Sequence, residues 1–128
     1  MFRRTVAGGL ALAAAGLVLA SGSAANADVR APYARAAAIV DSDGELNNGK
    51  NIIKTWRAAT GQYCVQVDYD VDVRDAVIQI TPRYALRLPH IAYRNPSPSC
   101  HKANTISVNV YNTSTGRLAD GGFDLSIA

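Results

Sequence analysis

The sequence has few residues of the kinds that carry enzyme chemistry. Its 128 residues include two histidines, two cysteines and one glutamate, Glu45. Glycoside hydrolysis needs two positioned carboxylates, and one glutamate among aspartates that lie mostly in turns gives it little support. His90 and His101 each lie beside a proline-rich or serine-rich turn, and no serine has the sequence context of a nucleophile elbow. The sequence therefore identifies no catalytic residue.

Long hydrophobic runs are also scarce. The longest, Val6–Ala20, is about fifteen residues of Val, Ala, Gly and Leu, fewer than the roughly 20 that cross a bilayer as a stable helix. Arg3 and Arg4 precede it, and Ala25-Asn26-Ala27 matches the small-x-small pattern that signal peptidase cleaves. We therefore expect residues 1–27 to be a cleaved secretory signal peptide, with a retained membrane anchor as the alternative. No cysteine lies near the cleavage site, which excludes a lipoprotein.

Little net charge remains once the signal peptide is removed. The full chain carries +3, but Arg3 and Arg4 belong to the signal, so eleven basic residues remain against ten acidic ones. The full chain has a sequence pI of about 9.1. Because the signal peptide accounts for most of its net positive charge, this pI gives no support for nucleic-acid binding. We expect no nucleic-acid partner, no membrane association after cleavage, and no cofactor. About 100 residues form one domain, expected at 36–128 after a flexible lead at 28–35.

The two cysteines, Cys64 and Cys100, both lie in the exported part of the chain. In an oxidising compartment an even pair predicts one disulfide. Closing a loop of this length stabilises a domain by roughly 3–4 kcal/mol in the chain-entropy model. A reactive or metal-binding thiol is the alternative, and it needs a reducing environment.

No stretch of the exported part shows a long apolar period of 3.6 residues, whereas short alternating runs are common. Alternating apolar residues predict strands with one inward face. Examples are Val65 and Val67, Val108 and Val110, and Leu125 with Phe123 and Ile127. Six to seven strands predict an all-β fold, an antiparallel β-sandwich or small barrel. The expected strands are 36–40, 52–57, 62–69, 76–81, 88–94, 105–111 and 122–127.

Three of these expectations concern particular residues. Asn47-Asn48-Gly49 predicts a turn. Pro89 places the 88–94 strand at a sheet edge, because proline has no N–H to donate. In an immunoglobulin-like arrangement Trp56 would be a core residue.

The acidic cluster Asp41, Asp43 and Glu45 resembles part of a calcium loop, with carboxylates at alternating positions around a glycine. These three are weak calcium candidates, because the further ligands of a calcium loop are missing. Asp68, Asp70 and Asp72 would have to supply oxygens. An Asp-Gly turn is the favoured interpretation, and no metal site is expected.

Charge is unevenly distributed along the chain. No acidic residue lies between Asp75 and Asp120, while residues 41–75 have a net charge of −3. This basic, aromatic-bearing segment predicts a surface for an anionic wall polymer or an acidic protein. The alternative is that the two halves face each other and cancel. The candidate ligand-surface residues are Arg83, Tyr84, Arg87, Tyr93, Arg94 and Lys102.

Aromatic residues give a second candidate surface, a platform on which sugars stack. Trp and alternating Tyr residues more often pack in cores or between strands, so both interpretations stay open. The aromatic residues concerned are Trp56, Tyr63, Tyr69, Tyr84, Tyr93 and Tyr111.

Two segments carry a resemblance to known proteins. Ala38–Gly44, an apolar strand leading into an acidic-Gly turn, and Thr60–Val65, a Gly-x-Tyr-x-Val strand, resemble small exported single-disulfide β proteins of actinomycetes. Similar patterns occur in β domains appended to phage tail fibres. The resemblance covers roughly residues 36–70. It implies a β fold and export, and it carries no catalytic residue.

Three functional hypotheses follow. The first is a secreted, non-enzymatic β domain, extracellular or cell-wall associated, that binds a cell-wall polymer or a protein through its surface. The second is a disulfide-stabilised inhibitor of an extracellular hydrolase, with Asn95–His101 as its binding loop. The third, and least supported, is a small secreted hydrolase.

Overall fold

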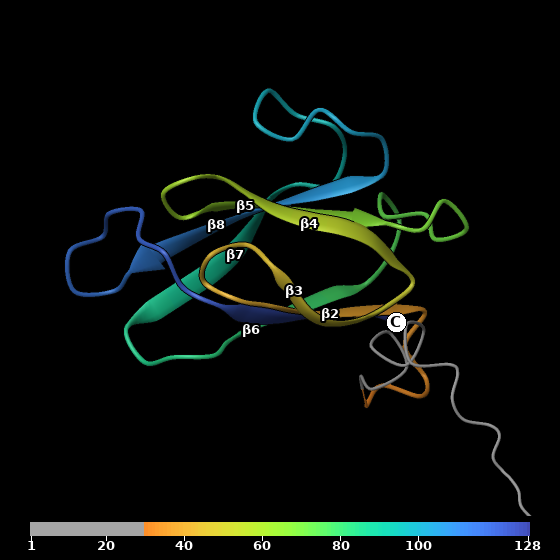
Figure 1. The fold of residues 1–128 in the computed structure, drawn as a ribbon, viewed down its shortest axis with the longest axis horizontal. Helices are drawn as coiled ribbons and strands as arrows, with labels where there is room; N and C mark the ends of the chain where they lie inside the picture. Colours follow the sequence, from red (N-terminus) through yellow and green to blue (C-terminus); the bar gives the residue numbers. More distant parts are fainter. Residues whose placement is uncertain (1–29) are drawn as a thin grey trace, which may run out of the picture.

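The computed structural model describes residues 30–128, and the predicted signal peptide at 1–27 lies outside the described residues. The described chain forms two four-stranded antiparallel sheets and contains no helix (Figure 1). No helix long and apolar enough to cross a membrane therefore occurs in this part of the chain. The sheets do not close on each other, so the predicted all-β class is confirmed as an open sandwich.

Each sheet draws strands from both halves of the chain. The first sheet contains, in spatial order, β3 (Leu46–Lys50), β2 (Ala36–Val40), β9 (Phe123–Ile127) and β6 (Ile78–Pro82). The second sheet contains β4 (Ile52–Ala59), β5 (Gln62–Val67), β8 (Thr105–Asn112) and β7 (Arg87–Tyr93). Pro89 lies in β7, an edge strand, as predicted. Proline at an edge removes an N–H that would otherwise be open to another strand.

The described residues contain eight strands rather than six or seven, because Asn47-Asn48-Gly49 lies within β3 rather than in a turn. Pairing with β2 outweighs the weak strand preference of these residues. Gly49 is buried, and a Cβ there would lie 3.0 Å from Leu46 Cδ2. The turn lies earlier, around Gly44, and Asn51 at φ +57° then carries the chain into the second sheet.

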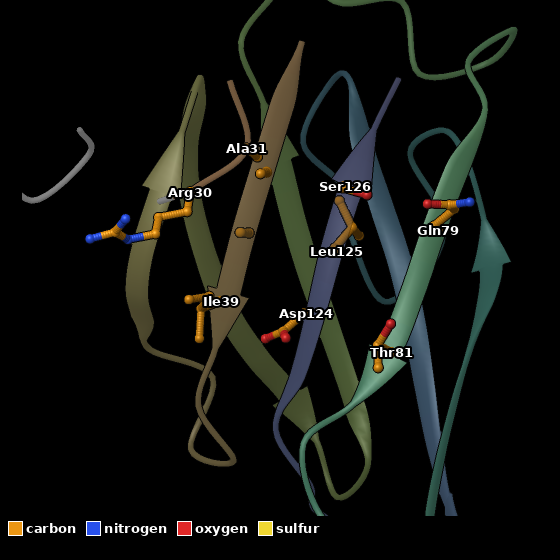
Figure 2. Close-up of a pocket in the computed structure, with 10 residues that line it drawn as sticks. Arg30, Ala31, Ile39, Gln79, Thr81, Asp124, Leu125 and Ser126 are labelled. Carbon is orange, nitrogen blue, oxygen red and sulfur yellow. The ribbon is translucent and has the colours of Figure 1, made fainter. Parts of the chain in front are cut away.

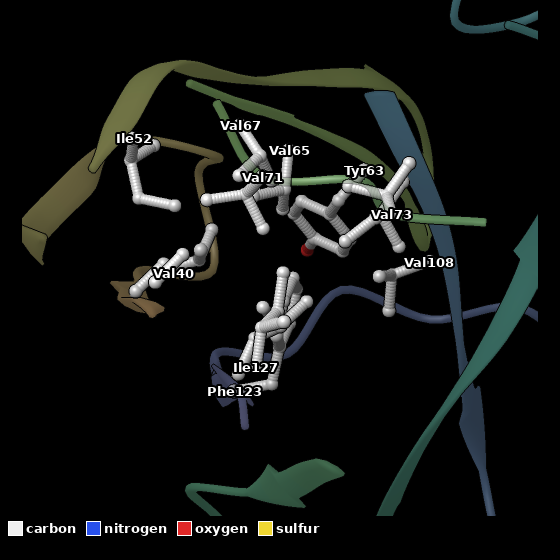
Figure 3. Packing of buried hydrophobic residues seen from close by; sticks show 14 of the residues in the cluster. Val40, Ile52, Tyr63, Val65, Val67, Val71, Val73, Val108, Phe123 and Ile127 are labelled. Carbon is white, nitrogen blue, oxygen red and sulfur yellow. The ribbon is translucent and has the colours of Figure 1, made fainter. Parts of the chain in front are cut away.

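The core lies between the sheets and follows the predicted alternation (Figure 3). Tyr63 is fully buried, and its ring lies 5.6 Å from that of Phe123 on the opposite sheet, edge to face. This contact joins the two sheets with one of the favoured aromatic geometries. Tyr69, which alternates with Tyr63 in the sequence, lies beyond the end of β5 and is exposed. The alternating residues that are found in the core are Tyr63, Val65, Val67, Ile106, Val108, Val110, Phe123, Leu125 and Ile127.

A polar network closes one end of the sandwich around the Tyr63 hydroxyl. That hydroxyl lies 2.7 Å from the Ser42 carbonyl oxygen and 3.3 Å from Asp120 Oδ1, and it accepts the N–H of Gly121. Asp120 Oδ1 also accepts the N–H of Gly61 at 2.8 Å and Arg57 Nε at 3.0 Å. Burial raises the pKa of Tyr63. Burial also acts to raise the pKa of Asp120, but the Arg57 and Gly61 hydrogen bonds outweigh it and hold that pKa below its ordinary value.

The lowered pKa of Asp120 predicts a specific acid dependence. The ordinary pKa of an aspartate side chain is 3.8. As pH falls, Asp120 is protonated first in the unfolded chain, so the stability that its ionised form contributes is complete at pH values well above 3.8. It is lost as pH falls through that value towards the lower folded pKa. Asp120→Asn should be about 1–2 kcal/mol less stable at neutral pH and lose less stability on acidification. Urea unfolding across a pH series measures both, and parallel acid curves for the two proteins would contradict this expectation.

The predicted disulfide joins Cys64 and Cys100, with an S–S distance of 2.02 Å. Cys64 points to the outer face of the second sheet, because its neighbours Tyr63 and Val65 point into the core. Cys100 comes from the connection between β7 and β8, residues 94–104, which arches over this face (Figure 1). Both cysteines are buried, as is Ser107 beside them. The bridge therefore fastens a loop to the outside of a sheet and does not cross the core.

Candidate functional site

Trp56, the only tryptophan, lies on the outer face of the second sheet. Its register partner in β5 is the outward-pointing Cys64, so the tryptophan side chain shares the face that carries the disulfide. It is half-buried and lies outside the core. The expectation that Trp56 is a core residue is therefore wrong. The reason is an irregularity in β4: Ile52 points into the core, and uninterrupted alternation would place Trp56 on the same face. The register shift between Ile52 and Lys54 reverses the alternation, so Trp56 points outward opposite Cys64.

Trp56 forms part of a shallow depression of about 540 Å³, which we call the Trp56 shelf. One wall comes from the edge strand β4, and the other comes from the disulfide-held 94–104 connection. The lining residues are Lys54, Trp56, Arg57, Ala58, Ser99, His101 and Lys102.

The shelf combines an aromatic face with several basic groups. Lys54 Nζ lies 5.6 Å from the centre of the Trp56 ring, within the range of a cation–π contact. Lys102 and His101 enter from the opposite wall, and both are exposed. Arg57 is engaged by Asp120 at 3.0 Å. None of the described residues that line the shelf is acidic, so the surface has a positive character.

The wall that carries His101 and Lys102 is held at several points. Cys100 exchanges backbone hydrogen bonds with Ser97, whose N–H donates to the Cys100 carbonyl oxygen at 2.8 Å. Ser97 is buried, whereas Pro96 and Pro98 are exposed. The His101 ring contacts the carbonyl oxygen of Pro98. These anchors preorganise the wall, and the Asn95–His101 inhibitor loop stays a prediction.

The six predicted ligand-surface residues fall into two groups at the two ends of β7. At the first end, Arg83 Nη1 lies 2.6 Å from Asp124 Oδ1, and Arg87 Nε donates to the Asp120 carbonyl oxygen at 2.6 Å. The Asp124 hydrogen bond raises the pKa of Arg83. Tyr84 is exposed between them. The two arginines thus support the fold at this end.

The second group lies beyond the other end of β7, a strand that spans about 20 Å at the usual rise per residue. Tyr93 is exposed, whereas Arg94 Nη1 donates to the Ala76 carbonyl oxygen at 2.6 Å. Lys102 belongs to the Trp56 shelf. The structure thus brings Lys102 together with Trp56 and Lys54 rather than with Arg83.

The weak calcium candidates lie in and beside the β2–β3 turn. Gly44 donates its N–H to the Asp41 carbonyl oxygen, and Asp43 Oδ1 accepts the N–H of Glu45 at 3.0 Å. Asp41 Oδ1 accepts a hydrogen bond from Asn47. Nowhere in residues 30–128 do three or more His, Cys, Asp or Glu side chains gather in a way that would hold a metal ion.

The remaining aromatic residues do not join the shelf. Tyr63 is in the core, and Tyr69 and Tyr84 are exposed on loops. Tyr111 stacks against His90, with ring centres 5.1 Å apart and ring planes 4° from parallel. The predicted platform of several aromatic residues is thus represented at the shelf by Trp56 alone.

The outer face of the first sheet carries a second groove, of about 450 Å³ (Figure 2). Alanine and uncharged polar side chains make most of its lining, and Figure 2 shows Arg30 extending away from Leu125. Asp124, its one acidic lining residue, is engaged by Arg83. The groove has no aromatic lining residue and no free charged group from β2, β6 or β9. It therefore offers less specific chemistry than the Trp56 shelf.

Comparison with protein-family models, with curated proteins and with solved structures gives no match to this chain. The class supported by the fold is a single-disulfide, open β-sandwich with a basic aromatic shelf on one outer face.

Proposed function

We propose that this chain is an exported, non-enzymatic binding domain that holds an anionic cell-wall polymer on the Trp56 shelf. The observation that carries the proposal is the half-buried Trp56, flanked by Lys54 on one wall and by Lys102 on a wall fixed by the disulfide. A buried disulfide is typical of an oxidising compartment. Together with the N-terminal signal pattern and the resemblance to exported actinomycete proteins, it supports export.

The chemistry of the shelf suits a polyol-phosphate or sugar-phosphate chain, such as a teichoic acid. An indole face packs against the apolar face of a sugar or polyol, and ammonium groups attract phosphate. A shallow, open depression admits a long chain from either side. A basic surface with an aromatic anchor therefore recognises a repeating anionic polymer with modest affinity per site. Such recognition requires no catalytic residue.

Truncation of Trp56 gives the most specific test of this proposal. Trp56→Ala should weaken binding to purified poly(glycerol phosphate) by about 30-fold, because tryptophan anchors commonly contribute about 2 kcal/mol. Lys102→Gln should weaken it by roughly two- to fivefold, the effect of one exposed charge. Isothermal titration calorimetry at low and high salt measures both losses, and salt should weaken the wild-type protein by screening.

Matched control variants are available elsewhere on the chain. Tyr69→Ala removes an aromatic side chain that is 69% exposed, and Arg74→Gln removes an exposed charge outside the shelf. Both should bind like the wild type, and neutral dextran should not bind. If Trp56→Ala bound the polymer as tightly as the wild type, or if Tyr69→Ala lost as much, the proposal would be wrong.

A further inference from the structure

We infer that the end of the sandwich opposite the Arg94 end of β7 is a surface on which two copies of this chain associate. The surface is formed by three connections, the 41–45 turn, the 83–86 loop and the 113–117 loop. Figure 1 shows them at the same end of the molecule. This surface is separate from the Trp56 shelf, and the inference does not depend on polymer binding.

The 83–86 loop presents apolar side chains to solvent. All four of its residues are exposed, with Tyr84 at 66% and Leu86 at 57%, and Leu88 follows at 54%. Leu86 has φ +65°, a left-handed conformation that a branched side chain rarely adopts. Glycine or asparagine would hold this backbone with less strain and without exposing a leucine. Exposed apolar groups on a strained backbone are typical of binding surfaces.

The loop is nevertheless rigidly held, which lowers the entropy cost of association. The Arg83 N–H donates to the Gly122 carbonyl oxygen, and the Leu86 carbonyl oxygen accepts the N–H of Thr113 at 3.1 Å. Arg87 packs on Gly121, where a Cβ would lie 2.7 Å from Arg87 Cγ. The exposed side chains are therefore presented in one arrangement.

Charges around the loop favour a second copy over an unrelated partner. Ser42 of the acidic turn lines a depression of about 360 Å³ with Tyr84 and Leu86. The 113–117 loop, which ends at the exposed Arg117, is joined to the Leu86 carbonyl oxygen through Thr113. One surface thus carries an apolar centre, an acidic part and a basic part. Neither Glu45 nor Arg117 forms an ion pair with any residue in 30–128.

Such a surface is self-complementary about a two-fold axis. In a symmetric dimer the same patch meets itself, so residue i contacts residue j and j contacts i. An axis through the 83–86 loops would pack Tyr84 and Leu86 together and bring Glu45 of one copy towards Arg117 of the other. A partner of one charge sign would be attracted by one part of this surface and repelled by the other.

The test is analytical ultracentrifugation of the chain without residues 1–27 over a wide concentration range. The wild type should show a monomer–dimer equilibrium, and Leu86→Asn should weaken the dimer by about tenfold or more. Asparagine tolerates the left-handed backbone, so this variant should fold at least as stably as the wild type. Val77→Asn, at a residue that is 65% exposed outside the three connections, is the matched control and should leave the dimer unchanged.

Charge exchange tests the proposed contact itself. Glu45→Arg and Arg117→Glu should each weaken self-association, because each places like charges opposite one another. Mixing the two variants should restore association as a heterodimer. A wild type that stays monomeric at every concentration would overturn the inference. So would a dimer that Leu86→Asn leaves intact, or a mixture that associates no better than either variant alone.

Discussion

Removal of the Cys64–Cys100 bridge is expected to lower the free energy of unfolding by about 4 kcal/mol. The two cysteines are 36 residues apart, and in the chain-entropy model closing a loop of that length restricts the unfolded chain by this amount. Most domains are stable by only about 5–15 kcal/mol. The unbridged protein should therefore be close to the limit at which it remains folded.

The same change should abolish polymer binding before it abolishes the fold. Without the bridge, the 94–104 connection loses its covalent link to β5, and His101 and Lys102 are no longer held opposite Trp56. The Cys64→Ala/Cys100→Ala double variant should keep the circular dichroism spectrum of a β protein at low temperature. Its urea midpoint should fall, and its binding to poly(glycerol phosphate) should be lost. An unchanged midpoint would contradict the stabilising role, and retained binding would contradict the role of the wall.

The second large effect is expected at Gly61, in the two-residue turn between β4 and β5. Gly61 has φ +67°, and a Cβ there would lie 2.6 Å from the Val110 carbonyl oxygen and 2.7 Å from the Ala119 nitrogen. Both contacts are with backbone, so neither can be relieved by a side-chain movement. Gly61→Ala should destabilise the domain by about 3–4 kcal/mol, the left-handed conformation contributing about 1–2 and the clash the rest.

Gly116 provides the matched control for this experiment. Its φ is +71°, but no heavy atom lies within 4 Å of a Cβ placed there. Gly116→Ala should therefore cost only about 1–2 kcal/mol, the backbone contribution alone. Chemical denaturation of the two variants separates conformational strain from close packing. If both variants lost the same free energy of unfolding, the close packing of Gly61 against β8 and Ala119 would contribute nothing to stability.

Much of the fold was predictable, because strand alternation is a local property of the sequence. Gln62–Val67 and Thr105–Asn112 showed their inward faces directly, and Pro89 indicated an edge. β3 was not predictable, since Asn47-Asn48-Gly49 forms a strand only through pairing with β2. That pairing is a tertiary interaction, which the local propensity of these residues does not contain.

The candidate site was less predictable than the fold. The segment Arg83–Lys102 is continuous in sequence, but β7 separates its two ends in space. Its arginines are hydrogen-bonded within the fold: Arg83 to the Asp124 side chain, and Arg87 and Arg94 to backbone carbonyl oxygens. Lys54 and Trp56 lay outside that segment. Their two-residue spacing on a strand was a signal that they share a face of the sheet. Whether that face points to the core or to solvent depends on the register shift between Ile52 and Lys54, which arises from pairing with β5.

The central claim, that the Trp56 shelf binds an anionic polymer, is tested most directly by tryptophan fluorescence. Trp56 is the chain's only tryptophan, so its emission reports on the shelf alone. Titration with poly(glycerol phosphate) should change that emission to saturation, and added salt should reverse the change. Polymer binding detected by calorimetry with no change in Trp56 emission would place the binding elsewhere and contradict the claim.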